Sequence, residues 1–183
     1  MNMIYTHLLL NDVPVIGSFL GIVLLIFGCY FKSEDIIKVS FGFLMVIGMA
    51  TIPVYSTGNY AELYIEDLAG VTKTLTDTHE RSAIFALAAL MFLATITASA
   101  LVVYRKKPIP KWVVYLTLVY TLYCGWVVTG TAKLGGQIRH TEIRPHHPDN
   151  EQVIKKEKEA KLSDRKKPQA MQKGLLRNAN PLH

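Results

Sequence analysis

Hydrophobic residues occupy four long stretches of the chain, separated by polar segments. The stretches cover about residues 13–31, 39–55, 82–104 and 112–132. Within each of them apolar residues follow one another continuously instead of alternating with polar ones, which argues against strand hairpins. A helix needs about 20 mostly apolar residues to cross a bilayer, and it satisfies its own backbone hydrogen bonds there. The pattern therefore predicts an all-α integral membrane protein with four transmembrane helices.

Two of the connections between these stretches are short and basic. They cover about residues 31–38 and 105–111, and short turns favour antiparallel neighbours in an up-down-up-down four-helix bundle. In that topology both turns lie on one side of the membrane. Their cationic residues are Lys32, Lys38, Arg105, Lys106, Lys107 and Lys111. The positive-inside rule makes that side cytoplasmic, so the N-terminus, the segment 56–81 and the C-terminal tail are expected outside.

The segment between the second and third stretches has a helical pattern of its own. Its apolar residues recur at helical spacing, at Ala61, Tyr64, Ile65 and Leu68. This spacing predicts a short amphipathic helix in the outer loop, lying on the membrane or over the mouth of the bundle. Gly70 is expected to end this helix, and a second short helix is expected to lead through His79 into the third stretch.

The character of the chain changes after the fourth stretch. We expect a transmembrane domain over residues 1–145 and a polar, basic tail over residues 146–183. The 183 residues are 50% hydrophobic and 19% charged, with a net charge of +6, and this composition excludes a disordered chain and a disulfide scaffold. A basic tail can bind nucleic acid or anionic lipid. A solvated tail is the plainer interpretation, and no nucleic-acid motif accompanies it.

The chain offers little support for an enzyme with a familiar catalytic motif. Cys29 and Cys124 both lie inside apolar stretches, which is typical of small buried side chains and not of zinc ligands or disulfide partners. No Ser-His-Asp arrangement and no phosphate-binding glycine loop is visible. Hydrolase and kinase functions therefore have no support.

Three of the six histidines stand beside the ends of the apolar stretches. His7 precedes the first stretch, His79 precedes the third and His140 follows the fourth. In an up-down-up-down bundle all three lie on the same side of the membrane at similar depth. A single interfacial histidine is usually a headgroup contact, but ionisable residues facing a bundle interior mark functional sites. Because neutral imidazole ligates haem iron and most transition metals, we expect a cofactor site, with His79 and His140 as the preferred pair.

Several neighbours of these histidines are suited to supporting a ligand. A ligating imidazole needs its second nitrogen held by another polar group, and the candidates are Asn11, Asp12, Glu80 and Glu142. Gly135 and Gly136 would let a flat macrocycle approach closely, although glycines also commonly end helices. Arg139 would pair with a haem propionate, or it would anchor the helix at the membrane surface.

Three segments taken together resemble a known family. They are His-Leu-Leu-Leu-Asn at 7–11 with Pro-Val-Ile-Gly at 14–17, Thr-Gly-x-x-Ala-Glu at 57–62 with His-Glu at 79–80, and Leu-Gly-Gly-Gln-Ile-Arg-His-Thr-Glu-Ile at 134–143. Over about residues 5–145 the chain is similar to a domain-of-unknown-function family of small bacterial membrane proteins, often described as cytochrome-b-like. The resemblance implies a bacterial inner-membrane protein that holds one or two haem b groups through His7, His79 and His140. Many members carry a histidine where this chain has Asp12, so a site is either lost here or given a carboxylate ligand suited to a harder metal.

Three functions follow from these observations. The first is electron transfer by a b-type haem in a respiratory or redox-complex subunit, rather than a stand-alone enzyme, with a quinol or a periplasmic cytochrome as the redox partner. Two axial histidines leave no open position on the iron, and haem c would need a Cys-x-x-Cys-His motif that the chain lacks.

The second function is a copper, zinc or non-haem iron site. Its candidate ligands are His7, Asp12, His79, Glu80 and His140. The third is a cofactor-free structural or assembly subunit that binds other membrane subunits. Visible absorbance separates the first function from the other two.

Overall fold

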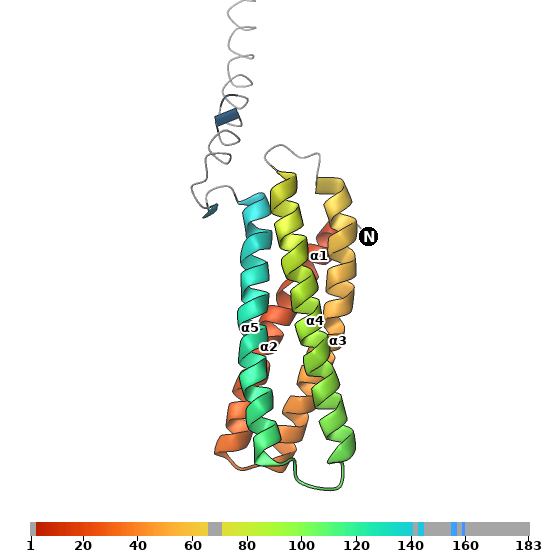
Figure 1. Ribbon diagram of the computed structural model, residues 1–183, viewed down its shortest axis with the longest axis vertical. Coiled ribbons are helices and arrows are strands. Elements are labelled where there is room, and N and C mark those ends of the chain that lie inside the picture. Colours follow the sequence, from red (N-terminus) through yellow and green to blue (C-terminus); the bar gives the residue numbers. More distant parts are fainter. Residues whose placement is uncertain (1–2, 66–70, 141–142, 145–154, 157–158, 160–183) are drawn as a thin grey trace, which may run out of the picture. The chain divides into compact units, whose positions relative to one another are not determined.

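The computed structural model describes residues 3–65, 71–140, 143–144, 155–156 and 159 (Figure 1). The chain divides into two compact units, Met1–Asp67 with Val71–Arg139, and Leu68–Gly70 with His140–His183. The first unit contains the helices α1 (Met3–Leu10), α2 (Asp12–Tyr30), α3 (Glu34–Ile65), α4 (Lys73–Val103) and α5 (Lys111–Arg139). Helices form all the regular structure described in this unit, as the sequence predicts.

Four helical segments are long and apolar enough to cross a membrane. α1 and α2 together form one of them, because Asn11 between them keeps a helical backbone and its N–H donates to the His7 carbonyl at 2.9 Å. α3, α4 and nearly all of α5 form the other three. Pro14 lies in the first turn of α2, at the junction with α1, and its missing N–H cannot donate to the Leu10 carbonyl one turn earlier. The prediction of four membrane-length helices is confirmed.

The prediction of separate short helices between the second and third apolar stretches is wrong for the residues that the structure describes. Ala61, Tyr64 and Ile65 belong to the last turns of α3, and His79 lies within the continuous helix α4. The polar residues 56–59 suggest a loop in the sequence, but the Thr57 hydroxyl donates to the Pro53 carbonyl at 2.8 Å and the chain stays helical. Leu68 and Gly70 lie outside the described residues.

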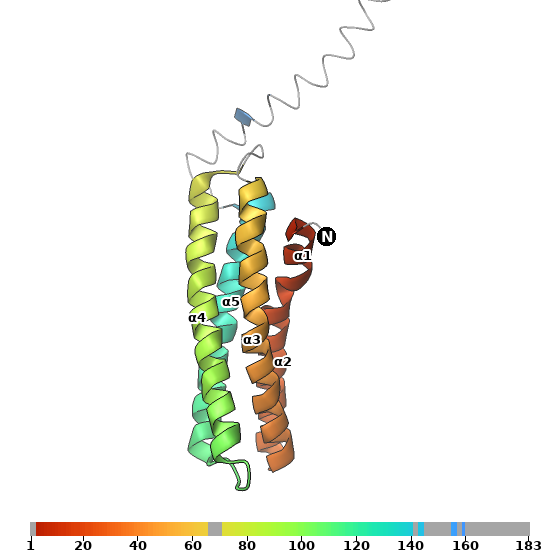
Figure 2. The ribbon, with the colours of Figure 1, turned by 90° about the vertical axis from the view of Figure 1, so that its right-hand side faces the viewer.

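The four long helices lie side by side (Figures 1 and 2). Their buried side chains form one hydrophobic core cluster among the described residues. α2 packs against α3 and α5, α4 also packs against α3 and α5, and α1 packs mainly against α3. The largest fully buried side chains of the core include Leu25, Phe41, Leu44, Leu90 and Leu93. α3 and α4 approach closely at Gly48, where a Cβ atom would lie 2.5 Å from the Leu90 carbonyl oxygen.

The outward faces of the helices are apolar as well. Phe85 is 73% exposed and Trp126 is 75% exposed, although both lie within helices of membrane-crossing length. Large apolar side chains on the outside as well as the inside are compatible with a lipid environment, in which the exterior is solvated by hydrocarbon.

The ends of the helices fall into two groups (Figure 1). The turns from α2 to α3 and from α4 to α5 lie at one end of the unit, and the Ile109 backbone N–H of one turn donates to Glu34 Oε2 beside the other at 3.2 Å. At the opposite end lie α1, the last turns of α3 and α5 and the first turns of α4. His7 and His79 therefore share an end of the unit.

Candidate cofactor site

The imidazole of His7 is held against the backbone of α3. His7 Nδ1 lies 3.1 Å from the carbonyl oxygen of Val54. One helical turn further along α3, Gly58 leaves the ring room, since a Cβ atom there would lie 3.0 Å from His7 Cε1. The Thr57 hydroxyl lies 3.5 Å from the same Nδ1, at the outer limit of a hydrogen bond. We refer to His7, Val54 and Gly58 as the first cradle.

The imidazole of His79 is held in the same way against α5. His79 Nδ1 lies 3.2 Å from the carbonyl oxygen of Thr131. One turn further along α5, a Cβ atom at Gly135 would lie 2.9 Å from His79 Cε1. Here Ser82 Oγ lies 2.7 Å from Thr131 Oγ1 and adds a link between α4 and α5. We refer to His79, Thr131 and Gly135 as the second cradle.

The two cradles define the tautomer of both rings. A carbonyl oxygen only accepts hydrogen bonds, so Nδ1 of each neutral imidazole carries the proton and donates it. Nε2 is then left with its lone pair, which is the atom and the state in which histidine binds a metal. Both side chains are half-buried. The candidate supports named from the sequence were Asn11, Asp12, Glu80 and Glu142, whereas the partners in the structure are the backbone carbonyls of Val54 and Thr131.

Asn11 adds a polar group beside the first cradle. It follows His7 by one helical turn, and its Oδ1 atom is buried without a hydrogen-bond partner. A buried, unsatisfied acceptor costs free energy, so this atom has unused capacity to bind a polar group. Asn11 was among the predicted supporting residues, but Asp12, the next residue, is exposed to solvent.

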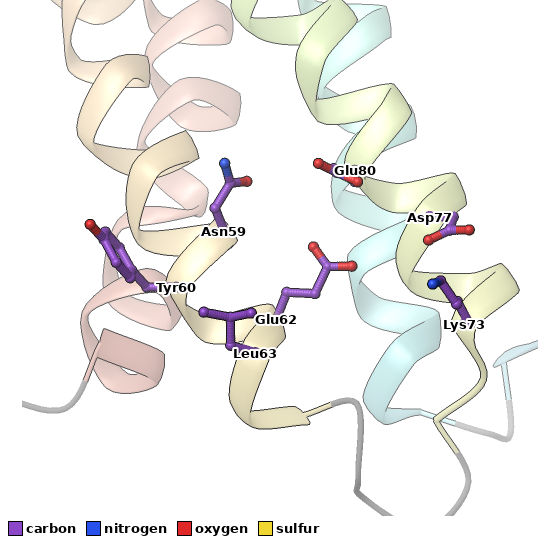
Figure 3. Close-up of a pocket in the computed structure, with 7 residues that line it drawn as sticks. All are labelled: Asn59, Tyr60, Glu62, Leu63, Lys73, Asp77 and Glu80. Atoms are coloured by element: carbon purple, nitrogen blue, oxygen red, sulfur yellow. The ribbon is translucent and has the colours of Figure 1, made fainter.

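The carboxylates at this end gather away from the imidazole nitrogens. Ligand atoms of Glu62, Asp77 and Glu80 lie within 4.8 Å of one another. They line a cavity of about 470 Å³ between α3 and α4 that Asn59, Tyr60, Leu63 and Lys73 complete (Figure 3). Among the described residues this acidic group is the only cluster of three metal-binding side chains, and it contains no histidine. Glu80 therefore belongs to this acidic cluster.

The remaining predicted site residues lie at or beyond the end of α5. Gly136 and Arg139 belong to α5, and nothing is described of the Arg139 side chain. His140 is exposed and belongs to the second unit, which is described by itself. Glu142 lies outside the described residues. The pairing of His79 with His140 thus stays a prediction.

Sequence reasoning missed the helical partners of the histidines. Val54 and Thr131 act through their backbone carbonyls, which no side-chain pattern reveals. Gly58 stands in the Thr-Gly-x-x-Ala-Glu segment that carries part of the family resemblance, and this was the one available signal. Searches against protein-family descriptions, curated proteins and solved structures find no match to the chain, so that resemblance also stays a prediction.

Proposed function

We propose that this chain is a membrane-embedded b-type haem protein that transfers electrons, and that His7 and His79 would hold the haem iron. The observation that supports this most directly is the repeated cradle. Two imidazoles from different helices each use Nδ1 on a backbone carbonyl and keep Nε2 for a metal. A bound haem would supply a one-electron iron couple, and two histidine ligands favour electron exchange over oxygen binding.

The residues present fit such a group. Gly58 and Gly135 let the two imidazole rings lie directly against α3 and α5, where any Cβ atom would crowd them. The Asn11 Oδ1 atom is buried and unsatisfied. If the Asn11 amide rotates, its NH₂ group can donate to a haem propionate. The buried position would then hold a hydrogen-bonded donor in place of the unsatisfied Oδ1 atom. Membrane bundles hold such cofactors between facing helices.

A bare transition-metal ion fits the same site less well. Copper, zinc and non-haem iron sites usually take three or more protein ligands. Within the described residues no third histidine, cysteine or carboxylate joins His7 and His79 in a cluster of metal-binding size. Two imidazoles alone would suffice to hold the iron of a haem, because the porphyrin supplies the other ligands.

We further propose an up-down-up-down arrangement across the bacterial inner membrane, with the cradles near the periplasmic face and the basic turns inside. The redox partner is a quinol in the bilayer or a periplasmic cytochrome. The chain then acts as a subunit of a redox complex. The positive-inside rule supports the orientation, because all six cations of the two turns lie at the end away from the cradles.

The test is a reduced-minus-oxidised visible spectrum of the purified protein, made in cells supplied with haem. We expect a b-type α band that His7→Ala and His79→Ala each abolish. His183→Ala in the tail is the matched control and should leave the band unchanged. If His140→Ala abolishes the band and His7→Ala does not, the ligand pair is the one preferred from the sequence. Absence of a Soret band from the wild-type protein would refute the haem proposal.

A further inference from the structure

The end of the first unit opposite the cradles carries a dense positive charge. Five of its cations are exposed and Lys38 is half-buried. Together they are Lys32, Lys38, Arg105, Lys106, Lys107 and Lys111, and we refer to them as the basic end. Against these six cations stand the two carboxylates Glu34 and Asp35, which leaves a net charge of +4. Such a field attracts anions to this end.

The basic end is an ordered surface. Ile109, between the two prolines of the second turn, is 3% exposed and belongs to the hydrophobic core. Its N–H donates to Glu34 Oε2, which ties the two turns together and occupies one of the two carboxylates. Lys32 adopts the left-handed conformation (φ 49°) in a turn closed by the Ser33 N–H on the Gly28 carbonyl at 3.0 Å. The cations are therefore presented from fixed turns.

Exposed aromatic side chains flank these cations. Tyr30 is 77% exposed and Phe31 is 64% exposed at the end of α2, and Trp112 is 63% exposed at the start of α5. Aromatic rings of this kind concentrate where the hydrocarbon of a bilayer meets its headgroups. The adjacent cations then lie at the depth of the lipid phosphates.

We propose that the basic end binds the headgroups of anionic phospholipids. Each headgroup offers a phosphate to Lys or Arg at the level of the turns, and its acyl chains lie along the aromatic and apolar faces of α2 and α5. Arg105 suits this role because a guanidinium binds phosphate oxygens in pairs. The inference rests on charge and exposure at the turns, so it is independent of the haem proposal.

The test uses the full-length protein in detergent, titrated with fluorescent phosphatidylglycerol and, separately, with fluorescent phosphatidylcholine. A cation at a lipid surface strengthens anion binding about fivefold at low salt, so the wild-type protein should prefer phosphatidylglycerol by at least about tenfold. The variant Arg105→Gln/Lys106→Gln/Lys107→Gln/Lys111→Gln should lose that preference. The charge-matched control replaces four tail lysines, Lys155→Gln, Lys156→Gln, Lys166→Gln and Lys167→Gln, and should keep it.

Three outcomes would overturn the proposal. The first is equal binding of the two lipids by the wild-type protein. The second is a loss of the preference for phosphatidylglycerol in the tail variant and not in the variant of the basic end. The third is full displacement of phosphatidylglycerol by millimolar inorganic phosphate, which would show that the lipid chains do not contribute to binding. If the quadruple variant of the basic end loses its helical circular dichroism, the single variant Lys106→Gln is measured instead. Its preference for phosphatidylglycerol should fall about fivefold.

Discussion

The two histidine cradles are alike in their contacts and different in their supports. In each, an imidazole Nδ1 faces a helix carbonyl and a glycine follows one turn later. His7, however, lies on α1, an eight-residue helix in which no residue is buried. His79 lies in the second turn of the long helix α4, where the Ser82–Thr131 hydroxyl pair fastens α4 to α5 beside it.

The two histidines therefore have similar contacts but differ in how firmly their helices hold them. His7 reaches its helix carbonyl from the terminal segment α1, and His79 reaches its own from the long bundle helix α4. α1 is the terminal segment of the continuous helix that it forms with α2, and terminal turns with few packed residues open most readily. We therefore expect the second cradle to be preformed and the first to gain order when a ligand binds, which the following substitutions test.

The largest effect is expected where the two cradles are most alike, at their glycines. In Gly135→Ala the new Cβ would lie 2.9 Å from His79 Cε1, and in Gly58→Ala it would lie 3.0 Å from His7 Cε1. Either ring must move and lengthen its hydrogen bond to the carbonyl. Because losing an outer partner of a ligating histidine typically weakens metal binding about 10–100-fold, we expect haem affinity to fall by that order, more for Gly135→Ala than for Gly58→Ala.

Each substitution has a matched control in the same helix. A Cβ atom at Gly42 in α3 or at Gly130 in α5 would meet nothing within 4 Å. Gly42→Ala and Gly130→Ala should bind haem like the wild-type protein and stabilise their helices by up to about 1 kcal/mol. Haem titration followed at the Soret band measures all four variants. Equal affinity in all of them would mean that the glycines serve only helix packing.

A smaller effect is expected at Asn11, which lies beside the first cradle. Its buried Oδ1 atom has no hydrogen-bond partner, and an unsatisfied buried polar atom costs about 1–3 kcal/mol. Asn11→Leu should therefore raise the thermal stability of the cofactor-free protein and lower its haem affinity about fivefold, the equivalent of roughly 1 kcal/mol. A variant that gains stability without losing affinity would show that Asn11 does not contact the bound group.

The contrast between fold and site also shows what a sequence can predict. The four apolar stretches predicted the four membrane-length helices, because continuous hydrophobicity over this length has few alternative structures. The extension of α3 to Ile65 was missed, since residues 56–59 are polar, and a hydroxyl such as that of Thr57 can donate to its own helix without interrupting it. His7 and His79 could be selected as candidates because imidazoles near the ends of apolar stretches are visible in the sequence.

The partners of those histidines were not predictable in the same way. The contacts with Val54 and Thr131 depend on which carbonyls α3 and α5 turn towards α1 and α4. Rotation and register of packed helices follow from core shapes such as Gly48 against Leu90, and the hydropathy pattern does not contain them. The preference for His140 came from its position in an assumed topology. Such an argument predicts the side of the membrane on which His140 lies, but not its distance from His79.

The finest comparison concerns the hydroxyl groups that stand behind the two rings. Ser82 Oγ and Thr131 Oγ1 lie 2.7 Å apart, whereas Thr57 Oγ1 lies 3.5 Å from His7 Nδ1 and donates to the Pro53 and Val54 carbonyls instead. Because a net hydrogen bond is worth about 1 kcal/mol, Ser82→Ala should speed haem dissociation by up to about fivefold. Thr57→Val should change the rate by less than about twofold, since the 3.5 Å contact lies at the limit of hydrogen bonding. Transfer of haem to excess apomyoglobin measures both rates. A larger effect of Thr57→Val than of Ser82→Ala would mean that the contacts of α1 at His7, and not those of α4 at His79, determine the rate of haem dissociation.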